Sequence, residues 1–93
     1  MIKFNGGKLV MTRAVNDLIA DNTPFAKFVV ASLAKHFNGD WGQMVEEDRY
    51  ANEDALKQGG RLFSAYEEAN LPKIWIITEA DRSATTVLFP EDY

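Results

Sequence analysis

The hydrophobic pattern changes its period at Gly59-Gly60, and this change constrains the fold more than any other feature of the sequence. Before it, apolar side chains between Pro24 and Phe37 recur at steps of three and four residues, as on one face of an α-helix. After it, three runs rich in β-branched and aromatic residues favour β-strands. These runs are Arg61 to Glu67, Lys73 to Glu79 and Thr85 to Phe89. Helices followed by strands are typical of an α+β fold.

The chain has 93 residues, which leaves room for one domain over residues 1–93. Turn-forming residues at Asn70-Leu71-Pro72 and Asp81-Arg82-Ser83 separate the three strand-like runs. Short connections favour antiparallel neighbours. We therefore expect N-terminal helices packed on one face of a C-terminal three-stranded antiparallel meander. Lys8 to Met11 can add a short N-terminal strand.

Capping residues divide the first half of the chain into helices. Thr12 is placed to cap a short helix over residues 13–20, and Thr23 to cap the next helix, with Pro24 as its first residue. The polar stretch from Asp40 to Gln58 is expected to contain one or two short helices. The side chains expected to point inward from it are Tyr50, Ala51, Ala55 and Leu56.

The middle strand-like run is apolar on both faces. Ile74 and Ile76 alternate with Trp75 and Ile77 there, so apolar side chains point to both sides of the sheet. Helices can cover only one of these sides. The other side would need the N-terminal segment or a second copy of the chain, and this predicts a homodimer.

The composition excludes several classes of function. There is no cysteine, which excludes disulfides, thiolate metal sites and thiol nucleophiles. The net charge is −4 and the pI is near 4.8, which argues against binding to nucleic-acid phosphates or anionic lipid. The longest nearly uncharged run, Phe28 to Ala34, is far shorter than the roughly 20 residues that span a bilayer. We expect a cytoplasmic protein without membrane, cofactor or direct nucleic-acid binding.

Negative charge is concentrated in residues 40–54, where six acids accompany one base, Arg49, for a net charge of −5. On a helix, such carboxylates can stand in for phosphates and occupy a basic groove on a DNA-handling protein. The alternative is a solvated helical face whose acids lie near helix N-termini, where the dipole favours them. No calcium-loop pattern occurs, so no metal site is expected. The candidate partner-binding residues are Asp40, Trp41, Glu46, Glu47, Asp48, Glu53 and Asp54.

Two of the remaining features can be interpreted as catalytic or as structural. Glu79, Asp81 and Arg82 can act as acid, base and anion clamp in a small hydrolase or transferase. More simply, Asp81 caps its own turn and Arg82 pairs with a carboxylate. His36 is the only histidine and lies near a helix C-terminus, where the dipole favours imidazolium. Ser83 lacks the glycine-flanked elbow of a serine nucleophile, so no catalytic residue is assigned.

Trp41 and the strand aromatics also have two interpretations. Trp41 either fills the core beneath its loop or anchors a partner, and filling the core is favoured. Four strand aromatics can in principle stack on bases, and they are Phe63, Tyr66, Trp75 and Phe89. No basic residues are interleaved among them, so they do not predict a nucleic-acid platform.

Several stretches form a recognisable combination. They are Thr12-Arg13-Ala14-Val15-Asn16-Asp17 with Phe25-Ala26-Lys27-Phe28-Val29, then Gly39-Asp40-Trp41-Gly42, then Lys73 to Ser83 running on to Thr85-Thr86-Val87-Leu88-Phe89-Pro90. Over residues 8–93 the chain resembles a family of small bacterial proteins labelled "plasmid-related protein". The resemblance implies an association with plasmids and other mobile elements, which carry small acidic proteins against host restriction or CRISPR defences. It brings no activity, cofactor or site residue to this chain.

Some members of that family carry the label of a type I restriction modification subunit. A DNA adenine methyltransferase needs a Gly-rich cofactor loop and a Pro-Pro-aromatic tetrapeptide, and this chain has neither. The leading hypothesis is therefore a non-catalytic protein-interaction module that uses the acidic segment 40–54 and the sheet aromatics. A small hydrolase or transferase built on Glu79, Asp81 and Arg82 and a structural accessory subunit are the alternatives.

Overall fold

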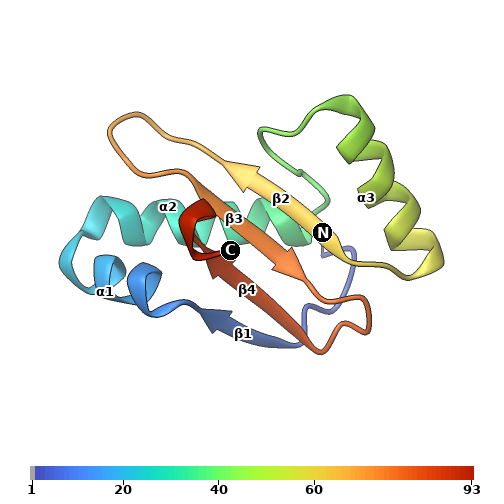
Figure 1. Cartoon of the computed structure of the whole chain (residues 1–93), viewed down its shortest axis with the longest axis horizontal. Coiled ribbons are helices and arrows are strands. Elements are labelled where there is room, and N and C mark those ends of the chain that lie inside the picture. The colour runs from blue at the N-terminus through green and yellow to red at the C-terminus, as the bar shows by residue number, and fades with distance from the viewer. Residues whose placement is uncertain (1) are drawn as a thin grey trace.

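The computed structural model describes residues 2–93, which form three α-helices and four strands (Figure 1). In chain order these are β1 (Lys8–Met11), α1 (Arg13–Asp21), α2 (Thr23–Phe37), α3 (Glu46–Gln58), β2 (Leu62–Tyr66), β3 (Ile74–Thr78) and β4 (Ala84–Leu88), followed by a 3-10 turn over Pro90–Asp92. The α+β class expected from the change of hydrophobic period is confirmed.

The sheet is four-stranded and mixed, with the strand order β1-β4-β3-β2. β2 and β4 each pair antiparallel with β3, whereas β1 pairs parallel to β4 with Lys8 opposite Ala84. A three-stranded antiparallel meander is therefore wrong as a description of the whole sheet, because β1 adds a fourth strand that pairs parallel to β4, although β2, β3 and β4 pair antiparallel as expected. The reason is a contact between distant parts of the chain, because β1 joins the sheet beside its last strand.

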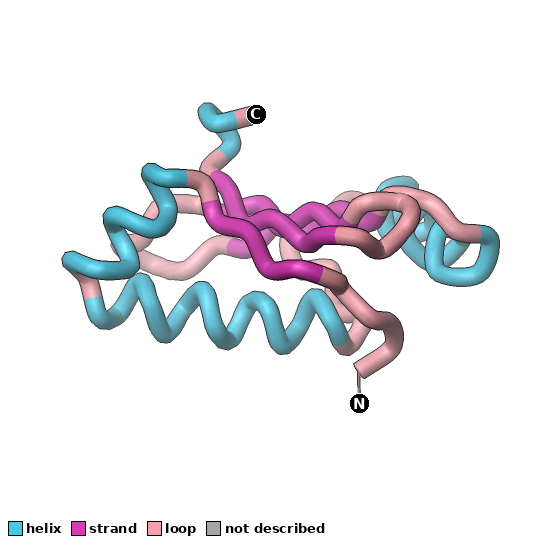
Figure 2. Tube along the Cα trace, turned by 90° about the horizontal axis from the view of Figure 1, so that it is seen from below, coloured by secondary structure: helices cyan, strands magenta, loops and turns pink. Residues whose placement is uncertain are grey.

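α2 lies along one face of the sheet, α1 lies at the end of the strands and leads down to α2, and the C-terminal residues lie on the other face (Figure 2). The core between the helices and the sheet contains Val15, Phe25, Phe28, Val29, Leu33, Tyr66, Ile74, Ile76, Val87 and Phe89. The spacing of the aromatic and aliphatic residues of α2 turns them toward the inward side chains of the strands. None of the helices in residues 2–93 is long and apolar enough to cross a membrane.

The second face of the sheet is covered differently from what the sequence suggests. Ile77 and Leu88 on this face are buried within the single chain. The ring of Tyr93 packs against Trp75 with 5.8 Å between ring centroids. The N-terminal segment covers the helix side instead, where Phe4 packs against residues of α2. The C-terminal Tyr93 therefore contributes to the cover of this face, on the side where the N-terminal segment or a second copy was expected.

Polar side chains cap the N-termini of α1 and α2. Thr12 accepts a hydrogen bond from the Val15 amide at 3.4 Å and caps α1 as expected. Asn22, rather than Thr23, caps α2 by accepting from the Phe25 amide at 2.9 Å. Asn22 has the extended backbone that a capping residue needs.

α3 runs beside β2 at the edge of the sheet, away from α2 (Figure 1). Tyr50 and Ala51, which were expected to point inward, are exposed, and Asn52 is buried instead. Its side-chain amide donates to the Phe63 carbonyl at 2.6 Å, and its carbonyl oxygen accepts from the Phe63 amide at 3.0 Å. The helix turns a polar residue inward because the strand edge presents unpaired peptide groups.

The loop between α2 and α3 closes the rest of the same edge. The Ala65 amide donates to the Trp41 carbonyl at 3.3 Å, and the Gln43 amide donates to the Ala65 carbonyl at 2.7 Å. Gly42 forms an isolated bridge with Ala65 at this point. Asn52 and this loop together pair the outward peptide groups of β2 at Phe63 and Ala65, and they protect the edge from other strands.

Replacement of Gly42 by alanine tests how tightly this loop is held against β2. Gly42 has a φ of 72°, and a Cβ there would lie 2.1 Å from the Ala65 carbonyl oxygen. We expect Gly42→Ala to lower the free energy of unfolding by about 2 kcal/mol, measured by urea denaturation. Gly59→Ala is the control, because Gly59 has a φ of 79° and open space around its Cβ position, and we expect a loss of about 1 kcal/mol. Equal losses in the two variants would contradict a tight approach of the loop to β2.

Candidate functional site

The outward side of α3 combines carboxylates with exposed apolar side chains. Val45, Glu46, Glu47 and Tyr50 line a shallow hollow, and Asp54 follows Tyr50 one helical turn later. Val45 is 64% exposed and Tyr50 is 72% exposed. The helix dipole stabilises the acids of the first turn. These five residues are called the α3 outer face below.

Within residues 2–93, no ion pair joins a base to the carboxylates of the α3 outer face. Arg49 is the only basic residue in residues 40–54, and its guanidinium points back to the preceding loop. Its Nε donates to the Met44 carbonyl at 3.2 Å and its Nη2 donates to the Gly42 carbonyl at 2.9 Å. The cation therefore holds the loop in place, and the carboxylates of Glu46 and Glu47 remain exposed to solvent.

The other predicted partner-binding residues do not form one surface with them. Trp41 is buried, and its Nε1 donates to a Glu53 carboxylate oxygen at 2.8 Å. Trp41 therefore fills the core beneath its loop, as favoured from the sequence, and its ring is not available to a partner. Asp40 accepts from the Gly42 amide at 3.2 Å within its own turn. Asp48 lines a separate hollow that also contains Arg61.

The polar turn between β3 and β4 holds its charged side chains in separate structural contacts. Arg82 donates to the Gly60 carbonyl at 2.5 Å and to the Ala55 carbonyl at 3.0 Å, and so binds the C-terminal end of α3. Its predicted carboxylate partner is thus replaced by carbonyls, which the helix dipole makes attractive to a cation. Asp81 accepts from the Ser83 amide at 2.9 Å. Hydrogen bonding to Ser83 lowers the pKa of the exposed Asp81 carboxyl.

Glu79 takes no part in this arrangement through its side chain. Its backbone carbonyl accepts from Arg82 at 3.2 Å, and its side chain is exposed. Asp81 and Arg82 therefore bind different backbone groups, and none of the pockets described in residues 2–93 is lined by Glu79, Asp81 and Arg82 together. The geometry favours the structural interpretation of this turn.

The buried His36 belongs to a chain of polar side chains that was not expected from the sequence. Its Nδ1 lies 2.5 Å from the Ser64 hydroxyl and its Nε2 lies 2.8 Å from the Thr78 hydroxyl. The Thr78 hydroxyl lies 2.7 Å from the Thr85 hydroxyl, which donates to the Gly6 carbonyl at 2.8 Å. All four side chains are buried. This chain crosses the interior from β2 to the N-terminal segment.

The hydrogen count along this chain determines the tautomer of the ring. Thr85 uses its only hydroxyl hydrogen on the Gly6 carbonyl, so Thr78 must donate to Thr85. Thr78 can then only accept from His36, which places the ring hydrogen on Nε2. Ser64 donates to the free Nδ1. Burial lowers the pKa of His36 from 6.5 to about 4, so the ring is neutral at pH 7. The expectation of a dipole-stabilised imidazolium is therefore wrong, because desolvation outweighs the dipole here.

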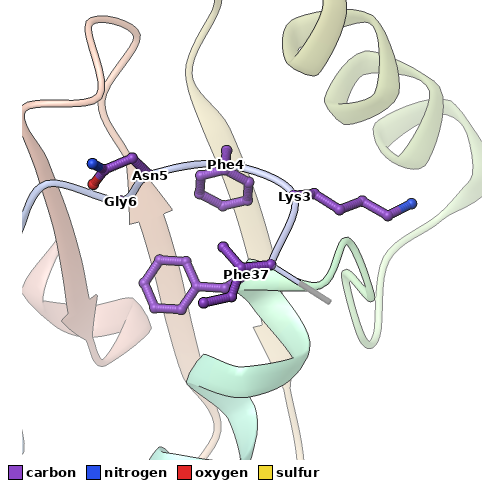
Figure 3. Close-up of a pocket in the computed structure, with 6 residues that line it drawn as sticks. Lys3, Phe4, Asn5, Gly6 and Phe37 are labelled. Carbon is purple, nitrogen blue, oxygen red and sulfur yellow. The ribbon is translucent and has the colours of Figure 1, made fainter.

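Aromatic rings separate the His36 chain from solvent. Phe4 packs edge-on against His36 with ring centroids 5.4 Å apart, and Trp41 packs against it at 5.6 Å. A pocket of about 470 Å³ lies on the outer side of this layer, between the N-terminal segment and Phe37 (Figure 3). Lys3 and Asn5 point to opposite sides of it in Figure 3. A Ser64 nucleophile activated by His36 would have no contact with substrate in this pocket, because both side chains are fully buried.

A signal for the His36 chain was present in the strand pattern. Ser64, Thr78 and Thr85 occupy the same inward positions as the apolar core residues of β2, β3 and β4. Polar residues at inward positions need partners. The single histidine on the inward side of α2 was the available partner.

Comparison with known proteins gave no family model, no curated protein and no solved structure that matches the chain. Over residues 2–93, no three His, Asp or Glu side chains are grouped as metal ligands would be.

Proposed function

We propose that the protein is a non-catalytic interaction module that binds a protein partner through the α3 outer face. The observation that carries the proposal is the exposure of Tyr50 and Val45 beside Glu46 and Glu47 on one side of a helix. An exposed tyrosine among charged residues is a common anchor of protein interfaces. α3 supports this role because it packs at the edge of the sheet, which leaves its outer side open.

The chemistry of the α3 outer face favours a basic partner with a small apolar depression. Glu46, Glu47 and Asp54 would meet its cations, and Tyr50 would fill the depression. A protein that handles DNA offers such a basic groove, and the carboxylates would then occupy the place of phosphates. The resemblance to proteins of mobile elements motivates a host restriction or CRISPR component as that partner.

Capture of partners from a host lysate tests this proposal. Neutralisation of Glu46, Glu47 and Asp54 to Gln, Gln and Asn should reduce capture at least tenfold at low salt, because the cations of the partner lose their counter-charges. Tyr50→Ala should reduce it by about 30-fold, which corresponds to loss of an anchor worth about 2 kcal/mol. Capture is measured by quantitative mass spectrometry of the eluted proteins.

The control removes equal charge from a distant place. Glu67, Glu68 and Glu91 are exposed acids outside α3, and the variant in which all three become Gln should capture the partner as well as the wild type does. Circular dichroism checks that each variant is folded. Equal capture by all variants would contradict the proposal and would favour a structural accessory subunit that uses another surface.

A further inference from the structure

The two outer edges of the sheet differ in whether their outward peptide groups are paired. The β2 edge is closed by Asn52 and by the loop at Gly42, as described above. β1 is the last strand at the other edge, and in residues 2–93 no segment pairs with its outer side (Figure 1). Leu9 is 49% exposed and Val10 is 37% exposed on this strand. An open edge with apolar side chains is a template for another strand.

The outward peptide groups of β1 can be identified from its pairing with β4. The Lys8 amide donates to the Ser83 carbonyl at 3.0 Å, and the Thr12 amide donates to the Val87 carbonyl at 3.1 Å. Backbone groups alternate in direction along a strand, so even-numbered residues face β4 and odd-numbered residues face outward. The N–H and C=O groups of Leu9 and Met11 are therefore the ones that a further strand would meet.

We propose that β1 pairs antiparallel with β1 of a second copy of this chain, around a two-fold axis at Val10. In this register Leu9 of each copy forms a hydrogen-bonded pair with Met11 of the other. A shift of one pair toward the N-terminus would use Gly7, whose φ of 66° is not extended. A shift toward the C-terminus would use Arg13, which is helical. Only the register centred on Val10 keeps both hydrogen-bonded pairs within extended residues.

The side chains are complementary in the same register. On the helix side of the sheet, Leu9 of one copy faces Met11 of the other. On the opposite side, Lys8 faces Thr12 of the second copy. Within each copy, the Thr12 hydroxyl donates to the Asp92 carboxylate at 2.8 Å. Each lysine thus approaches a carboxylate, and this happens twice because of the two-fold symmetry. Arg13 lies next to Thr12 but already pairs with Asp17 at 3.9 Å.

The proposed contact is small, so a weak and concentration-dependent dimer is expected. Four backbone hydrogen bonds and the side chains of one short strand bury less than a standard interface of about 1,600 Å². A dissociation constant on the order of 100 µM is consistent with such an area. The dimer would contain one continuous sheet with the helices of both copies on the same face.

A single engineered cysteine tests both the contact and its register, because the chain has no cysteine of its own. Val10 would face itself in a non-hydrogen-bonded pair with Cα atoms about 4.5 Å apart, which suits a disulfide. We expect Val10→Cys to form a disulfide-linked dimer at least ten times faster than two control variants under mild oxidation. Leu9→Cys is exposed on the same strand but lies diagonally from its copy, about 7–8 Å away. Val30→Cys is exposed on α2.

Sedimentation equilibrium of the cysteine-free chain provides the second readout. The wild type should associate with rising concentration, and Val10→Lys should weaken the association at least tenfold because it places two like charges opposite each other. Circular dichroism confirms that the variant is folded. A wild type that stays monomeric at millimolar concentration would overturn the proposal. Equal cross-linking rates of the three cysteine variants, or fastest cross-linking of Leu9→Cys, would overturn it as well.

Discussion

The free energy of unfolding is expected to fall by about 3 kcal/mol when the pH is lowered from 6.5 to 4, because of His36 alone. The unfolded chain takes up a proton at His36 near pH 6.5, whereas burial delays this uptake in the folded chain to about pH 4. Protons therefore bind the unfolded state preferentially between these values. Stability from the neutral ring is fully present above pH 6.5 and is lost as the pH falls through this window. Both ring nitrogens are bonded to hydroxyls, and neither is bonded to a carboxylate.

Two measurements separate this effect from the titration of carboxylates. His36 is the only histidine, so its ring gives a single set of imidazole NMR signals. Those signals should show the Nε2–H form and no titration between pH 8 and 5. Urea denaturation at each pH gives the free energies, and His36→Gln, which has no group titrating in this range, should lose most of the slope between pH 6.5 and 5. A ring that titrates near pH 6.5 in the folded protein would refute the buried neutral histidine.

Trp41→Ala is expected to lower the free energy of unfolding by about 3–5 kcal/mol, the range for removal of a buried tryptophan side chain. Trp41 is buried, stacks on Phe4 with centroids 6.4 Å apart and packs against His36. Its removal would leave a cavity where the N-terminal segment, α2 and the loop before α3 meet. Chemical denaturation followed by circular dichroism measures the loss.

Trp41→Phe is the matched control, because it keeps most of the apolar ring and removes the Nε1 donor. The lost partner is the Glu53 carboxylate, which is exposed and can bind water instead. We therefore expect a loss of about 1–2 kcal/mol in this variant. A loss in Trp41→Ala no larger than in Trp41→Phe would mean that the indole is not packed in the core. Amide exchange of α3 should also become faster in Trp41→Ala, because Trp41 links its loop to this helix through Glu53.

Local sequence patterns predicted the positions of helices and strands well where the spacing of apolar residues or a run of β-branched residues determines the secondary structure. The apolar spacing of α2 and the β-branched runs of β2, β3 and β4 lie where the sequence placed them, within one residue at every end. The exchange of Thr23 for Asn22 as the cap of α2 is a shift of one position between two good capping residues. The error at α3 was larger. Its inward side was chosen for apolar character, whereas the strand edge required the amide of Asn52.

The candidate site was only partly predictable for a related reason. The exposed acids of α3 were visible in the charge pattern. The roles of Trp41 and Arg82 depend on which backbone and side-chain groups lie near them, and these groups come from other parts of the chain. Arg82 was expected to find a carboxylate, but the C-terminal carbonyls of α3 were closer to it.

The sequence by itself determined the α+β class, the positions of the strands and helices and the concentration of acid in residues 40–54, because periodicity, turn residues and charge are local properties of a chain. Only the tertiary structure decided that β1 pairs parallel to β4, that His36 is neutral within a chain of hydroxyls and that one edge of the sheet is closed while the other is open. Each of these depends on contacts between residues tens of positions apart. The free energy of such contacts comes from burial and hydrogen bonding in three dimensions, which no local pattern records.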